Sequence, residues 1–152
     1  MSNFRLYPVP ESKLDNLKPI LKKVAEDFDA SRFKSPDVIL QFLNAGYVNR
    51  SIDVYVDDVE NPNHLLILAK VPSLWYNDMG VTVLLIFTVP EKRGDINILQ
   101  TMLRTAESYA VIHGADYISG SSWVYRGHKG TDVIWKANDY TLAETVFTKH
   151  LI

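Results

Sequence analysis

The sequence has no cysteine among its 152 residues. This absence excludes disulfide bonds, thiolate nucleophiles and zinc sites built on cysteine. Neither sign of charge dominates, because 16 lysines and arginines stand against 18 aspartates and glutamates, for a formal net charge of -2. Nucleic acids and anionic membrane surfaces attract basic proteins. We therefore expect neither a nucleic-acid partner nor a membrane partner.

Long hydrophobic runs are also lacking. The longest, VTVLLIFTV at residues 81–89, is far shorter than the roughly 20 residues of a membrane-spanning helix. The start, MSNFRLYPVPESK, lacks the basic leader and apolar stretch of a signal peptide. These two observations predict a cytoplasmic protein.

The few histidines show no spacing that is typical of metal ligands. We expect no metal site and place all of them at helix ends or on the surface: His64, His113, His128 and His150. No Ser-His-Asp, phosphate-loop lysine or paired-carboxylate pattern rises above chance either.

The hydrophobic pattern predicts one α/β domain over residues 1–152, since no repeat, linker or low-complexity tract divides it. Expected strands cover 4–9, 52–58, 65–71, 81–89 and 116–122, with a last β-rich segment at 140–151. Expected helices cover 12–28, Ser35 to Gly46, 96–113 and 129–138. Ser12, Ser35 and Thr131 are the expected caps of the first, second and fourth helix. Pro19 is expected to kink the first helix, and Gly114 to end the third.

The order of these elements predicts how the strands pair. A strand, a loop, a helix and another strand follow one another over residues 81–122, and such a crossover places two parallel strands side by side. The strands before it follow each other closely enough to be antiparallel. Because residues 81–89 are apolar on both faces, they belong at the centre of a sheet that is covered on both sides.

Three further groups of residues carry alternative readings. The acidic cluster Asp57, Asp58 and Glu60 could receive an amine, but a solvated turn is favoured. The aromatics Trp75 and Tyr76 could line an acceptor pocket, seal a sheet edge or meet a partner. The segment YRGHKG, residues 125–130, could grip a phosphate, but a surface loop is favoured.

Three stretches resemble the GNAT superfamily of acetyl-CoA-dependent N-acetyltransferases. They are VPEKRG at 89–94, LRTAESYAVIHGADYISGSS at 103–122 and VIWKANDYTLAETVFTKHLI at 133–152. The resemblance implies an α/β fold with a GNAT-like mixed central sheet, mostly antiparallel, flanked by about four helices. Its one parallel strand pair would lie at a splayed cleft that opens after Phe87.

The resemblance also implies where acetyl-CoA would bind. The fourth strand would offer backbone groups of Phe87, Thr88 and Val89 to the pantetheine arm and the acetyl carbonyl. The loop after it would wrap the pyrophosphate with Lys92, Arg93, Gly94, Asp95, Ile96 and Asn97. Backbone N–H groups at a helix N-terminus suit an anion because they are unpaired and lie at the positive end of the helix dipole.

Two departures from the family pattern matter. Ile96 and Ile98 stand where the family has glycine, and Asp95 adds a negative charge beside the phosphate site. These changes predict an eroded loop, with acetyl-CoA binding weakened or lost. Trp135 stands where many members have a tyrosine that protonates the leaving thiolate, and an indole N–H cannot take over this role. Tyr125 is therefore the candidate catalytic acid, and a water chain is the candidate base.

The resemblance leads to two functional hypotheses. In the first, the protein transfers an acetyl group from acetyl-CoA to an amine acceptor, either a small molecule or a protein. In the second, it is a catalytically inactive GNAT-fold protein that acts as a protein-binding or structural module. Short divergent proteins of that sort are familiar among bacteriophage and other mobile-element genes. Either hypothesis leaves a homodimer open.

Overall fold

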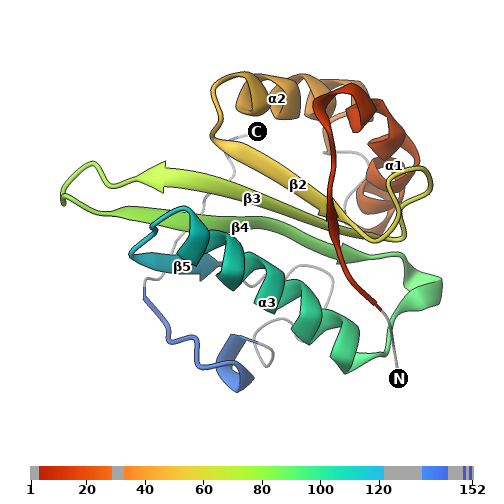
Figure 1. Cartoon of the computed structure of the whole chain (residues 1–152). Coiled ribbons are helices and arrows are strands. Elements are labelled where there is room, and N and C mark those ends of the chain that lie inside the picture. Colours follow the sequence, from red (N-terminus) through yellow and green to blue (C-terminus); the bar gives the residue numbers. More distant parts are fainter. Residues whose placement is uncertain (1–3, 29–32, 122–134, 144–148, 150, 152) are drawn as a thin grey trace. The chain divides into compact units, whose positions relative to one another are not determined.

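The computed structural model describes residues 4–28, 33–121, 135–143, 149 and 151. Contacts divide the chain into two units, Met1–Ser121 and Ser122–Ile152, and each is described by itself. The first unit contains a five-stranded sheet in the order β1-β2-β3-β4-β5 (Figure 1).

The sheet is mixed, as the sequence predicted. Its strands are β1 (Tyr7–Pro8), β2 (Ile52–Val56), β3 (His64–Pro72), β4 (Met79–Thr88) and β5 (Tyr117–Gly120). The first four pair antiparallel in sequence order, and β5 pairs parallel with β4. The first part of the apolar run VTVLLIFTV, residues 81–83, therefore lies between β3 and β5.

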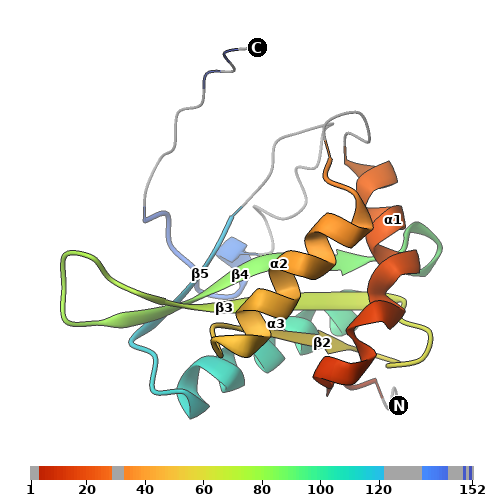
Figure 2. The same ribbon diagram turned by 90° about the horizontal axis from the view of Figure 1, so that it is seen from above.

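Helices cover both faces of this sheet. They are the 3₁₀ helices η1 (Glu11–Leu17) and η2 (Pro90–Lys92) and the α-helices α1 (Lys18–Asp27), α2 (Pro36–Val48) and α3 (Ile96–Ile112). Figures 1 and 2 show α1 and α2 on one face and α3 on the other. Tyr109 of α3 donates a hydrogen bond to Asp53 of β2 (2.6 Å), which ties α3 to the sheet.

The main hydrophobic core lies between the sheet and the pair α1 and α2. Alternate residues of β2 and β3 face it, as the period of two in β2 predicts. Its buried side chains include Leu21, Val24, Leu43, Val54, Leu65, Ile67 and Phe87. On the opposite face, α3 buries Met102, Leu103 and Ala106. The layers agree with the predicted coverage of the sheet on both sides.

The first predicted helix differs from the observed one. Residues 11–17 form a 3₁₀ helix, and the α-helix begins only at Lys18, with Pro19 in its first turn. The prediction of one helix kinked inside by Pro19 is wrong, because proline has no N–H to continue an α-helical ladder from the preceding residues. Ser12 is not a cap either, since the residue before η1 is Pro10.

The second predicted helix is correct at its start and wrong at its end. The Ser35 side chain accepts a hydrogen bond from the Val38 N–H (3.4 Å), as the capping prediction required. The helix continues past Gly46 to Val48. Gly46 is instead a point of close packing, because a Cβ there would lie 2.5 Å from Ile52 Cδ1.

Other boundaries also shift. The strand expected over residues 4–9 is reduced to Tyr7–Pro8, where Pro8 and Pro10 remove donors that a longer ladder needs. At the end of α3, Gly114 has φ +69, as its predicted role as a helix stop requires.

Of the second unit, the structure describes few residues. Residues 135–137 are helical, and residues 140–143, 149 and 151 lie outside strands, so that part of the expected β-rich ending does not form. The Trp135 and Tyr140 rings meet edge to face at 4.9 Å. The whole segment 125–130, which includes Tyr125 and His128, lies outside the described residues, as do Thr131 and His150.

Candidate functional site

The strand β4 has two unequal halves. Its inner half, Gly80 to Val83, pairs with the whole of β5, Tyr117 to Gly120. Directly after it, the register with β3 shifts, which leaves Leu84 as an extra bulged residue. A bulge bends a strand and ends regular pairing. Within the described residues the parallel pairing ends at Val83, four residues before the predicted point of divergence at Phe87.

In the outer half, Leu84 to Thr88, residues 85–88 remain paired with β3. On its other edge, no strand within the described part of the chain continues the pairing. Leu84 is 42% exposed, whereas Phe87 is buried in the main core. An unpaired strand edge presents main-chain donors and acceptors that an extended ligand can use. At the inner limit of this edge, Thr82 Oγ1 and Ser119 Oγ lie 3.2 Å apart and bridge the two strands.

The outer end of β4 is fixed by a buried histidine. His64 is 4% exposed, and its Nδ1 lies 2.8 Å from the Thr88 hydroxyl oxygen. Burial lowers the pKa of His64; the nearby charge of Asp57 opposes this shift and that of Lys92 adds to it. The prediction that every histidine lies at a helix end or on the surface is wrong for His64, because β3 begins one residue earlier than expected. His113, in contrast, follows the last turn of α3 as predicted.

The acidic cluster before β3 organises a turn. The Asp57 side chain accepts hydrogen bonds from the N–H groups of Asn63 and His64, both at 2.9 Å. Asp58 accepts from the N–H groups of Glu60 and Asn61. These bonds support the turn interpretation of the cluster. They also hold His64 in place beside Thr88.

The loop that follows β4 leads into α3. Gly94 has φ +108, a left-handed conformation that favours glycine. Asp95 caps α3, and its carboxylate accepts a hydrogen bond from the Asn97 N–H (2.9 Å). Ile96, the first helical residue, is exposed. The first turn of α3 thus has an amide that already binds a carboxylate.

Arg93 connects this loop to two other parts of the first unit. Its Nε donates to the Thr88 carbonyl oxygen (2.8 Å), and its two terminal nitrogens donate to the two carboxylate oxygens of Asp27 (3.3 and 2.9 Å). The guanidinium carbon also lies 5.2 Å from the centre of the Phe87 ring. Asp27 is the last residue of α1, so Arg93 joins the end of that helix to the end of β4.

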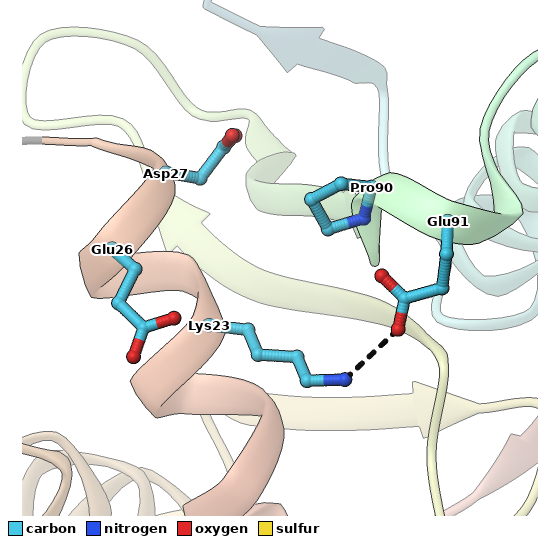
Figure 3. Close-up of a pocket in the computed structure, with 5 residues that line it drawn as sticks. All are labelled: Lys23, Glu26, Asp27, Pro90 and Glu91. Carbon is cyan, nitrogen blue, oxygen red and sulfur yellow. Dashed lines mark hydrogen bonds and ion pairs between the residues drawn. The ribbon is translucent and has the colours of Figure 1, made fainter.

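A cavity of about 270 Å³ lies beside this connection. It is lined by Lys23, Glu26, Asp27, Pro90 and Glu91 (Figure 3). Lys23 and Glu91 form an ion pair across it (3.1 Å). Asp27 and Glu91 both form ion pairs with basic side chains of the same chain. The cavity therefore lies where contacts join α1 to η2, and these two carboxylates of its lining are already paired.

The predicted cofactor residues form one continuous segment. It runs from the outer half of β4 through η2 to the first turn of α3 and contains Phe87, Thr88, Val89, Lys92, Arg93, Gly94, Asp95, Ile96 and Asn97. Neither a role for Asp27 nor the burial of His64 was predicted from the sequence. No sequence signal pairs Asp27 with Arg93, which lies 66 positions away. For His64, the signal was its place just before an apolar strand.

No group of three or more metal-ligating side chains occurs within the described residues. None of the helices that they form is long and apolar enough to cross a membrane.

Comparisons with known proteins identify the fold. No protein-family model and no curated protein matches the sequence. Among solved structures, a transcriptional regulator from Bacillus halodurans C-125 aligns with a TM-score of 0.79 at 15% identity, covering 98% of this chain and 100% of that one. A predicted acetyltransferase from Clostridium acetobutylicum, solved with acetyl-CoA, aligns with a TM-score of 0.75 at 12% identity, covering 97% and 96%.

A third similar structure is a ribosomal-protein-alanine N-acetyltransferase from Brucella melitensis biovar Abortus 2308. It aligns with a TM-score of 0.73 at 12% identity and covers 99% of both chains. At such identities the likeness concerns the fold alone. The predicted fold class is confirmed: the chain has a GNAT-like α/β fold, with a mixed sheet and one parallel strand pair.

Proposed function

We propose that this protein is a GNAT-like N-acyltransferase that moves an acetyl group from acetyl-CoA to an amine of a small molecule or a protein. The observation that carries the proposal is the bulge at Leu84, where β5 pairing stops and where β4 has, among the described residues, no partner strand on its second edge. That edge leads directly to the N-terminus of α3. The similarity of the fold to acetyltransferases supports the same reading.

The described residues fit acetyl-CoA in outline. The main chain of Leu84 to Thr88 would hold the pantetheine arm, and the α3 N-terminus would favour the negative pyrophosphate. When bound, the cofactor supplies an acyl carbon activated as a thioester. The fit requires an exchange of partners, because Asp95 and Asp27 already occupy the Asn97 amide and the Arg93 guanidinium. The need for this exchange supports the prediction that the loop binds acetyl-CoA weakly.

The chain's own residues limit how the chemistry can proceed. A neutral amine must attack, and main-chain N–H groups near the bulge would polarise the carbonyl. The polar side chains of β4 are the hydroxyls of Thr82 and Thr88, which are poor bases. We therefore propose that water removes the proton of the amine, and that Tyr125 protonates the leaving thiolate. The amine acceptor, a cytoplasmic location and a homodimer remain predictions.

The direct test is binding of acetyl-CoA to the full chain. At about 100 times the dissociation constant, a ligand that binds only the folded state stabilises it by about 2.7 kcal/mol, which should raise the melting temperature by about 5–10 °C. The matched control is acetate at the same concentration, which should give no shift. No shift with millimolar acetyl-CoA would contradict the proposal.

The inactive alternative is favoured by one observation, the occupation of the Asn97 amide by the Asp95 carboxylate. Glycine substitutions at Ile96 and Ile98 separate the two functions. If the loop is eroded from an active one, the double substitution should increase acetyl-CoA affinity. If the segment serves another purpose, the affinity should remain undetectable.

A further inference from the structure

The guanidinium of Arg93 forms a bidentate ion pair with a carboxylate of its own chain. The two terminal nitrogens face the two oxygens of Asp27, and the third donor, Nε, is bound to the Thr88 carbonyl. This two-point geometry is the one with which arginine also recognises phosphate, because a phosphate offers two oxygens at a similar spacing. Asp27 thus occupies the part of Arg93 that a diphosphate would need.

The burial of the pair allows such an exchange. The side chains of Arg93 and Asp27 are 37% and 19% exposed. They are shielded enough for the ion pair to have a measurable strength, yet the guanidinium remains within reach of solvent. Fully exposed pairs, in contrast, contribute little.

From this geometry we infer that Asp27 is a positioning residue that competes with the cofactor diphosphate for Arg93. The inference rests on the acetyl-CoA site proposed above. When a diphosphate binds, Arg93 exchanges the carboxylate for phosphate oxygens, and Asp27 at the end of α1 loses its contact with Arg93. Asp27 also lines the cavity between α1 and η2. Occupation of the cofactor site therefore changes the charge that this cavity presents.

The structure offers a matched control in the ion pair of Lys23 and Glu91. This pair also joins α1 to the segment between β4 and α3, with a distance of 3.1 Å. The variants Asp27→Asn and Glu91→Gln each remove one negative charge near the loop. Only Asp27→Asn releases Arg93. A difference between the two variants therefore isolates the competition from the general gain in positive potential.

The experiment is isothermal titration calorimetry on the full chain and on both variants, with three probes. Acetyl-CoA carries the diphosphate and the acyl arm, ADP carries the diphosphate alone, and S-acetylpantetheine carries the acyl arm alone. We expect Asp27→Asn to bind ADP and acetyl-CoA about fivefold more tightly than the wild type, as for loss of a partly shielded ion pair. Glu91→Gln should change these affinities less than about twofold, and S-acetylpantetheine should bind all three proteins equally.

The possible outcomes separate two claims: that Asp27 competes for Arg93, and that the protein has an acetyl-CoA site. If the wild type binds acetyl-CoA and Asp27→Asn binds ADP with equal or lower affinity, the competition is overturned while the acetyl-CoA site stands. If no protein binds acetyl-CoA or ADP, both claims are overturned, because freeing Arg93 should then have produced a diphosphate site. Circular dichroism checks folding, and Asp27→Ser is measured in parallel as a second variant with the same expected gain.

Discussion

The two halves of β4 have similar sequences and different surroundings. The inner half, Gly80 to Val83, is held by β3 on one edge and by β5 on the other. The outer half, Leu84 to Thr88, is held by β3 alone within the described part of the chain. Both halves belong to one apolar run. The difference therefore comes from the short length of β5 and from the bulge, not from hydrophobicity.

The outer half is nevertheless well fixed, because side-chain contacts secure its end. The Thr88 hydroxyl contacts His64, and the Thr88 carbonyl accepts from Arg93. Phe87 packs into the main core. A strand can thus keep one edge open for a ligand when its end is secured by polar contacts and one buried aromatic ring.

The largest effect is expected from removing that ring. Phe87→Ala should destabilise the protein by about 3–5 kcal/mol, because it leaves a cavity in the core between the sheet and the helices. The control Leu84→Ala, at an exposed position in the same half, should cost less than about 1 kcal/mol. Urea denaturation measures both. Equal losses would show that the outer half does not depend on Phe87 for its position.

A smaller effect concerns the contact between His64 and Thr88. Since burial lowers the pKa of His64 in the folded state, the folded protein binds its proton less readily than the unfolded chain. The contribution of neutral His64 to the free energy of unfolding is complete above the pKa of His64 in the unfolded chain, near 6.5. This contribution is lost as the pH falls toward the lower pKa of His64 in the folded protein.

The test compares wild type and His64→Asn by urea denaturation at pH 7.5 and pH 5. The variant should lose about 1 kcal/mol at pH 7.5, the usual value of one hydrogen bond. Its deficit should shrink at pH 5, because protonation of His64 in the unfolded chain lowers the stability of the wild type there. A deficit that is identical at both pH values would contradict a titrating His64.

The smallest effect is expected in the loop beyond the outer half. Asp95→Ser keeps a capping side chain for α3 and removes the negative charge next to the helix N-terminus. We expect ADP to bind about two- to fivefold more tightly, equivalent to about 0.5–1 kcal/mol of helix-end electrostatics. Calorimetry measures the gain. Weaker binding by the variant would show that the carboxylate does not compete with the diphosphate.

Local patterns in the sequence predicted much of the fold. The apolar run of β4 predicted a central strand, and Ser35 and Gly114 predicted helix limits, because each depends on nearby residues only. Pro19 was misjudged because its effect depends on where the helix begins. The contact of Asp27 with Arg93 could not be predicted, since it joins residues far apart in sequence and depends on how α1 packs against the sheet.

The most direct test of the open edge is hydrogen exchange of the β4 amides, read by mass spectrometry or NMR with and without saturating acetyl-CoA. We predict that residues 80–83 are strongly protected in both states, and that added protection appears in residues 84–88 and in the first turn of α3. An outer half that is already as protected as the inner half, or that gains nothing from acetyl-CoA, would contradict the account.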